Sequence, residues 1–169
     1  MHKQLAFSLP EVSRRTFCKR LARNLAGVLT LAHLQAEAAP AVLPASVSLP
    51  DELENALKIK EPLIVMVSLT GCPYCRMARN SYLGPMQKQG FPIVQVDMRS
   101  EQQVKGFTGQ LLSHDQVVKQ WRVSIAPTLL FFGPRGQEVA DRMEGGYLPD
   151  FYGNYLDERI AMARKALRA

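Results

Sequence analysis

The sequence predicts a small α/β sandwich whose sheet contains both parallel and antiparallel strands. Two short apolar segments, 63–69 and 92–98, have the composition of strands and are separated by enough residues for a helix, which favours a parallel pair. Two further segments, 129–132 and 137–143, flank a Gly-Pro-Arg-Gly turn, which favours an antiparallel pair. The chain has 169 residues, 47% hydrophobic and 21% charged, so we expect one compact domain with one core.

The first predicted helix follows residue 47. Segment 48–52 (SLPDE) has a capping residue, an early proline and acidic residues where the positive end of a helix lies. Leu53, Ala56 and Leu57 give this helix an apolar face. The segment 63–69 (LIVMVSL) comes next, and its nearly continuous apolar character is typical of a central strand buried on both faces.

A second helix is predicted from Pro73 to about Gly90, because proline is favoured at the first helical position and an apolar stripe continues from Cys75. After the strand 92–98, the polar stretch 99–112 is long for a connection and is interpreted as an insertion. Ser113 and Gln116 then match a capping box, which predicts a third helix.

The last predicted element is a helix over residues 149–167. Its apolar positions are Phe151, Tyr155, Ile160, Ala163 and Leu167. The predicted order is therefore helix, strand, helix, strand, helix, strand, strand, helix.

Residues 1–38 have the layout of an export signal peptide. A basic stretch at 14–23 precedes an apolar stretch at 25–34 and a small-residue cleavage site at 36–38. The apolar stretch is about half of the ~20 residues that span a bilayer, so no stable membrane insertion is expected. Residues 13–19 (SRRTFCK) resemble the twin-arginine export signal, and an ordinary secretory signal is the alternative. Either route leads out of the cytoplasm, and the resemblance implies a bacterial periplasm.

The net charge of +6 is concentrated in this signal. Residues 1–38 carry six basic and two acidic residues, so the remainder has a net charge of only +2. A nearly neutral domain lacks the basic surface that nucleic-acid binding needs, so no nucleic-acid partner is expected. Segment 39–47 (APAVLPASV) has no periodic apolar face and is predicted to be a flexible linker before a domain at 48–169.

Cleavage of the signal would remove Cys18 and leave Cys72 and Cys75, which in an oxidising compartment can pair only with each other. A disulfide across so short a loop constrains little of the unfolded chain, so a chemical role is favoured over a structural one. At the cap of a helix, the sulfur of Cys72 can accept the Cys75 N–H. This bond and the positive helix end favour the thiolate, so we expect Cys72 to attack substrates and Cys75 to resolve the mixed disulfide.

The residues near the cysteines leave alternatives open. Phe107 either forms an apolar contact surface with Tyr74 near the site or anchors its own insertion. Arg76 and Arg79 follow the cysteines and either stabilise a thiolate or are solvated. A zinc site would need further ligands, and His114, the only histidine after the signal, has no evident partner. No metal or cofactor is therefore expected, although two thiolates alone can hold a soft ion such as copper.

The sequence shares three features with a known family. These are Cys72-Pro73-Tyr74-Cys75 after a buried strand, Pro127-Thr128 at the start of a later strand, and a Gly-rich turn before a terminal helix. In these features the sequence resembles the thioredoxin superfamily. The resemblance covers roughly residues 48–167. It implies a three-layer sandwich with a mixed sheet of about four to five strands flanked by helices. It also implies a cis peptide bond at Pro127 and a substrate groove lined by Ala126 and Pro127, with Pro73 and Tyr74 as further substrate contacts.

A narrower resemblance is to periplasmic thioredoxin-like proteins of the SoxW type and to the catalytic domain of disulfide isomerases. It rests on the insertion and on Arg142, Gly146, Tyr147, Pro149 and Phe151. The chain departs from cytosolic thioredoxins, which have a buried aspartate where Met66 stands and a Trp-Cys-Gly-Pro-Cys site. Glutaredoxins share Pro-Tyr between the cysteines but usually have Thr-Val where Ile125-Ala126 stand, so glutathione specificity is not inferred.

The expected function is a monomeric periplasmic thiol–disulfide oxidoreductase that exchanges disulfides with protein substrates, in the reducing direction. The narrower resemblance implies a membrane thiol transporter as the electron donor. The alternative is a metallochaperone or haem-delivery thiol partner that uses the same cysteine pair. A third interpretation is a thioredoxin fold that serves only as an interaction module.

Overall fold

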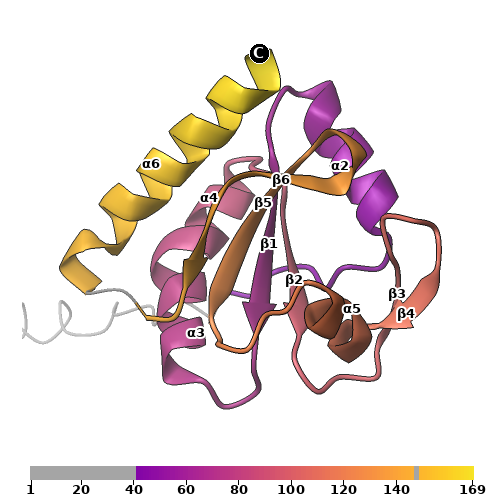
Figure 1. Cartoon of the computed structure of the whole chain (residues 1–169). Helices are drawn as coiled ribbons and strands as arrows, with labels where there is room; N and C mark the ends of the chain where they lie inside the picture. The colour runs from indigo at the N-terminus through magenta and orange to yellow at the C-terminus, as the bar shows by residue number, and fades with distance from the viewer. Residues whose placement is uncertain (1–40, 147–148) are drawn as a thin grey trace, which may run out of the picture. The chain divides into compact units, whose positions relative to one another are not determined.

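The computed structural model describes residues 41–146 and 149–169, which form a sheet with helices on both faces (Figure 1). The predicted export signal at 1–38 lies outside the described residues. The elements in chain order are α2 (Leu49–Lys58), β1 (Leu63–Ser68), α3 (Pro73–Ala78), the π-helical turn η1 (Arg79–Leu83), α4 (Gly84–Lys88), β2 (Ile93–Asp97), β3 (Gln103–Lys105), β4 (Leu111–Ser113), α5 (His114–Gln120), β5 (Thr128–Gly133), the 3-10 turn η2 (Pro134–Gly136), β6 (Gln137–Glu144) and α6 (Pro149–Arg168).

The four main strands form one mixed sheet in the order β2-β1-β5-β6. β1 and β2 are parallel, with Ile64 opposite Ile93 and Ser68 opposite Asp97. β5 is antiparallel to both β1 and β6. The predicted α/β sandwich with mixed strands is confirmed, and the carboxyl ends of β1 and β2 lie at the same edge of the sheet.

The sheet separates two apolar cores, so the domain has three layers (Figure 1). Successive side chains of a strand point to opposite faces. Ile64 and Met66 of β1 therefore pack in the core under α3 and α6, whereas Val65 and Val67 pack in the core under α2 and α5. All four side chains are at most 1% exposed, as expected for a central strand with both faces covered.

The helical run after the disulfide contains a π turn that the sequence did not predict. The N–H of Gly84 donates to the carbonyl of Arg79, five residues earlier. The next residue, Pro85, has no N–H and cannot continue the ordinary hydrogen-bond ladder. The run therefore continues to Lys88 with one wide turn, which begins at Arg79.

The predicted insertion at 99–112 contains most of a small hairpin, in which β3 and β4 pair antiparallel. Phe107, in its turn, packs its ring 4.8 Å from that of Phe132 and 6.3 Å from that of Trp121. These rings belong to the core under α2 and α5. Phe107 therefore anchors its own hairpin and forms no surface with Tyr74, which settles two alternatives that the sequence left open.

Segment 41–47, within the predicted linker, is instead held along the edge of β2. The N–H of Ser46 donates to Gln95 O at 2.8 Å, and the N–H of Gln95 donates to Pro44 O at the same distance. Ala45 and Gln95 form a parallel bridge, and Leu43 is 4% exposed in the core. The flexible-linker prediction is therefore wrong for these residues, because two backbone bonds and one buried side chain fix them without any periodic pattern.

His114 fastens this segment to the sheet. Its side chain is fully buried; Nδ1 accepts the N–H of Asp97 at 3.1 Å, and Nε2 lies 2.9 Å from the carbonyl of Ser46. A carbonyl only accepts, so Nε2 carries the ring proton. The imidazole thereby joins segment 41–47, β2 and α5 through one side chain.

The terminal helix α6 is present as predicted, and its predicted positions Ile160 and Ala163 are buried, but in its first turns the buried positions are shifted by one residue. Phe151 and Tyr155 are 52% and 41% exposed, whereas Tyr152 and Leu156 are each 1% exposed. The Tyr152 ring lies 4.8 Å from that of Tyr82. Aromatic residues at adjacent positions made two helix faces look equally apolar. None of the helices in the described residues is long and apolar enough to cross a membrane.

We predict that His114→Ala lowers the free energy of unfolding of the full-length protein by about 2–4 kcal/mol. The substitution leaves a cavity and two buried backbone groups without partners. Urea unfolding followed by circular dichroism measures the loss. Gln120→Ala, at an exposed position of the same helix, is the control and should change stability by less than about 0.5 kcal/mol. A loss below about 1 kcal/mol for His114→Ala would contradict the role of this residue as a fastening point.

Candidate active site

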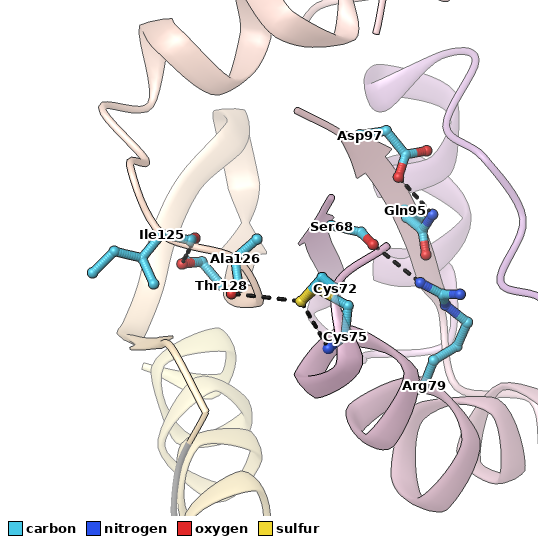
Figure 2. Close-up of a disulfide and its surroundings, with 9 residues drawn as sticks. All are labelled: Ser68, Cys72, Cys75, Arg79, Gln95, Asp97, Ile125, Ala126 and Thr128. Carbon is cyan, nitrogen blue, oxygen red and sulfur yellow. Dashed lines mark hydrogen bonds between the residues drawn. A yellow bond between two sulfur atoms is a disulfide. The ribbon is translucent and has the colours of Figure 1, made fainter. Parts of the chain in front are cut away.

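A disulfide joins Cys72 and Cys75 at the start of α3 (Figure 2). Gly71 has a φ of +80°, a conformation that favours glycine, and it lets the chain turn from the end of β1 into the helix. Cys72 is the N-cap residue, and its Sγ accepts the N–H of Cys75 at 3.1 Å. The predicted arrangement of the two cysteines is present, with 5.2 Å between their Cα atoms.

The two sulfur-bearing residues differ in access to solvent. Cys75 is fully buried in the core under α3. Cys72 is half-buried, and Pro73 and Tyr74 beside it are exposed, Tyr74 to 57%. A substrate disulfide can therefore reach Cys72 but not Cys75, which is the order that a two-step exchange needs.

The loop before β5 borders the disulfide on one side (Figure 2). The peptide bond between Ala126 and Pro127 is cis, and Cys72 Sγ lies 3.8 Å from Ala126 O. Thr128 Oγ1 donates to Ile125 O at 2.8 Å, and the N–H of Gly145 donates to Pro127 O at 2.7 Å. These bonds hold the loop on both sides of the buried Pro127.

Two further residues extend this side of the site. Tyr74 packs its ring against Gly146, where a Cβ would lie 2.7 Å from the nearest ring atom. Ile125 is 50% exposed and lies within contact distance of a Cβ built on Gly145. Ala126 thus borders the half-buried Cys72, and the exposed Tyr74 and Ile125 continue this apolar border away from the sulfur. Gly146 lets the Tyr74 ring pack closely because it lacks a side chain. Pro73, at the first helical position, is exposed beside them.

A polar cleft borders the other side of the disulfide (Figure 2). Its volume is about 370 Å³, and it is lined by Ser68, Leu69, Thr70, Gly71, Cys72, Arg76, Arg79, Gln95 and Asp97. Arg79 Nη2 donates to Ser68 Oγ at 3.0 Å, and Gln95 Nε2 donates to Asp97 Oδ1 at 2.8 Å. Arg76 is exposed. The structure thus separates two arginines that the sequence treated alike.

Sequence reasoning missed Ser68, Gln95 and Asp97. A signal was present, because these are the polar residues of two otherwise apolar strands and they lie at the same end of a parallel pair. Arg79 stands four residues after Cys75 and so lies on the same helix face.

Comparison with known proteins gives the family. The sequence model of the thioredoxin-like domain matches residues 49–159. The chain belongs to the thioredoxin-like domain family. Comparison with curated proteins gave no significant match.

Solved structures with a similar fold include a DsbH oxidoreductase, with 19% sequence identity, a TM-score of 0.49, and coverage of 86% of this chain and 98% of that one. A thioredoxin from Thermus thermophilus has 17% identity, a TM-score of 0.47, and coverage of 69% and 87%. Mitochondrial thioredoxin 3 from Saccharomyces cerevisiae has 19% identity, a TM-score of 0.45, and coverage of 69% and 93%.

The thioredoxin-like fold with a Cys-x-x-Cys pair is that of a thiol–disulfide oxidoreductase, which exchanges disulfides with protein thiols. This thioredoxin-like protein departs from the expected family pattern at Met66, which is fully buried in the core of Cys75. No carboxylate therefore stands at that position, and Asp97, from β2, lines the cleft that also includes Cys72.

Two residues considered for metal binding or substrate contact lie elsewhere. The nitrogens of His114 are both used within the fold, and the ring of Phe107 is packed under its hairpin. Within 41–146 and 149–169, no three His, Cys, Asp or Glu side chains are grouped so that they could hold a metal ion.

Proposed function

We propose that this thioredoxin-like protein works in the bacterial periplasm as a reductant of protein disulfides. The observation that carries the proposal is the asymmetry of the cysteine pair. The half-exposed sulfur of Cys72 accepts the Cys75 N–H at 3.1 Å, while Cys75 itself is fully buried. A hydrogen bond from a backbone N–H stabilises a negative charge on the sulfur of Cys72, and the thiolate is the nucleophile in disulfide exchange.

The exchange has two steps. The thiolate of Cys72 attacks one sulfur of the substrate disulfide and forms a bond to it, while the substrate S–S bond breaks. The other substrate sulfur leaves as a thiolate and takes a proton from water. Cys75 then loses its proton to water and attacks Cys72 Sγ, which releases the second substrate thiol and closes the Cys72–Cys75 disulfide. Two electrons pass from the cysteine pair to the substrate.

The loop at Ala126 and Pro127 is the proposed docking place for the substrate chain. It lies beside Cys72 Sγ, and its hydrogen bonds to β5 and to Gly145 keep it in place. The apolar border of Tyr74 and Ile125 offers contact area without a charge requirement. Pro73 adds exposed surface next to the attacking sulfur.

The reducing direction and the electron donor rest on the narrower resemblance to SoxW-type periplasmic proteins. We propose that a membrane thiol transporter reduces the Cys72–Cys75 disulfide after each turnover. One domain with one cysteine pair can carry out this cycle alone, so we propose a monomer.

Substitution of the cysteines should separate the two steps. Cys75→Ser should accumulate a mixed disulfide between Cys72 and the substrate, because the resolving thiol is missing. Cys72→Ser should form no such complex and lose insulin-reductase turnover by about a hundredfold or more. Non-reducing electrophoresis and mass spectrometry detect the complex.

Cys18→Ser is the matched control, because this cysteine lies in the predicted signal and should not affect turnover. If Cys72→Ser retains activity, or if Cys75→Ser forms a complex through Cys18, the proposed roles are wrong.

The reduction potential of the Cys72–Cys75 couple tests the direction. We expect a value near the ~−270 mV of thioredoxin, measured by equilibration of the full-length protein in dithiothreitol redox buffers. A value near the ~−120 mV of strong periplasmic oxidants would overturn the reductant proposal.

Export through the twin-arginine route predicts that Arg14→Lys with Arg15→Lys keeps the protein in the cytoplasm. Fractionation of bacterial cells measures the distribution. Arg20→Lys with Arg23→Lys makes the same chemical change outside the motif and should leave export intact. Retained export of the first variant would indicate the ordinary secretory route, and a wild-type protein found in the cytoplasm would contradict the periplasmic proposal.

A further inference from the structure

The polar cleft beside Cys72 lies on the same face of the sheet as the apolar core under α3. Ile64, Met66 and Ser68 of β1 point to the same face as Cys75, and so do Ile93, Gln95 and Asp97 of β2. Of these, Ile64, Met66 and Ile93 are buried and apolar. The layer between the sheet and α3 therefore changes from apolar to polar toward the end of the strands where Cys72 lies.

Arg79 brings a charge into this layer without a counter-ion. Its guanidinium donates through Nη2 to Ser68 Oγ, while its Nε is buried and has no hydrogen-bond partner. The Oε1 atom of Gln95, in the same cleft, is likewise buried without a partner. No carboxylate among the described residues lies within ion-pair distance of Arg79. A guanidinium that is partly withdrawn from water is stabilised by a paired anion, and no described carboxylate pairs with Arg79.

The charges around the cleft leave it positive. Asp97 also lines the cleft, but its Oδ1 accepts a hydrogen bond from Gln95 Nε2 at 2.8 Å. Its single negative charge offsets only one of the two arginine charges. Arg76 adds its charge at the exposed rim. The cleft includes Cys72 itself among its lining residues. An anion placed here would therefore lie next to the sulfur that attacks the substrate.

We propose that this cleft receives a carboxylate carried by the disulfide substrate next to its reacting sulfur, and that Arg79 is the residue that binds it. The inference rests on the proposed function. In the mixed disulfide, the substrate group joined to Cys72 would extend its main chain toward Ala126 and its carboxylate toward Arg79, since these residues border opposite sides of the disulfide (Figure 2). Guanidinium binds carboxylate in a planar, paired geometry, which suits it to this task.

The test compares disulfides of similar size and different charge. Reduced full-length protein is mixed with dithiodipropionate, hydroxyethyl disulfide or cystamine, which are anionic, neutral and cationic. Acid-quenched samples are analysed by mass spectrometry, and the second-order rate constant of Cys72–Cys75 oxidation is determined for each. A second arm uses two disulfide-linked peptides that differ only in having Glu or Gln beside the cysteine.

The wild type should favour the anionic over the neutral disulfide, and Arg79→Gln should lower this rate ratio about three- to tenfold. The ratio is the readout because a change in the thiolate content of Cys72 alters all the rates alike and cancels. Arg79→Lys, which keeps the charge, should retain most of the preference. Lys88→Gln removes the same charge from the exposed far end of α4 and should leave the ratio unchanged.

The arms also identify the source of the carboxylate. A preference only in the peptide arm assigns the cleft to acidic protein segments, and a preference only in the first arm assigns it to small dicarboxylate disulfides. An unchanged ratio for Arg79→Gln in both arms overturns the inference. Failure of the wild type to reduce any of the disulfides, the neutral one included, would instead count against the proposed function.

Discussion

The site depends on one short hydrogen bond, from the N–H of Cys75 to Sγ of Cys72. For this bond to form, the helix must begin at Pro73, so the chain must leave β1 and turn within the four residues 69–72. Gly71 makes that turn possible with its left-handed conformation. The central position of β1, buried on both faces, then holds the turn at a fixed place. In the reduced protein this bond would stabilise a thiolate at Cys72, and the same helical geometry directs Cys75 into the core.

The surroundings of the disulfide are divided into two unlike sides. On the side of β5, the loop at Ala126 and Pro127 and the exposed Tyr74 and Ile125 offer backbone and apolar surface. On the side of β2, Ser68, Arg79 and Asp97 form a polar cleft. The division follows from topology, because β5 and β2 are the two neighbours of β1. A substrate that meets both sides would be recognised by extended shape on one and by charge on the other.

Most of the fold could be predicted from local patterns, and the exceptions have a common cause. The strand at 63–69 is apolar except for Ser68, and the helix at 114–120 has a capping box, so both could be predicted from local sequence. Segment 41–47 was misinterpreted as a linker because its order comes from contacts with β2 and His114, which are distant in sequence. In the first turns of α6 the buried positions lie one residue later than predicted, because adjacent apolar residues gave two equally apolar faces.

The sequence by itself determined the order of the elements, the cysteine pair as the reacting group and Pro127 as its neighbour. The first two follow from local chemistry: periodic burial, a proline at a helix start, and two thiols three residues apart. The place of Pro127 was implied by the resemblance to the thioredoxin superfamily. Only the tertiary structure decided that Arg79 differs from Arg76. The pairing of β1 with β2 brings Ser68 and Asp97 together beneath α3, and the helical turn at Arg79 places its guanidinium against Ser68. Such a cluster depends both on the register of the two strands and on the rotation of the helix about its axis. Neither can be predicted from a single segment of the chain.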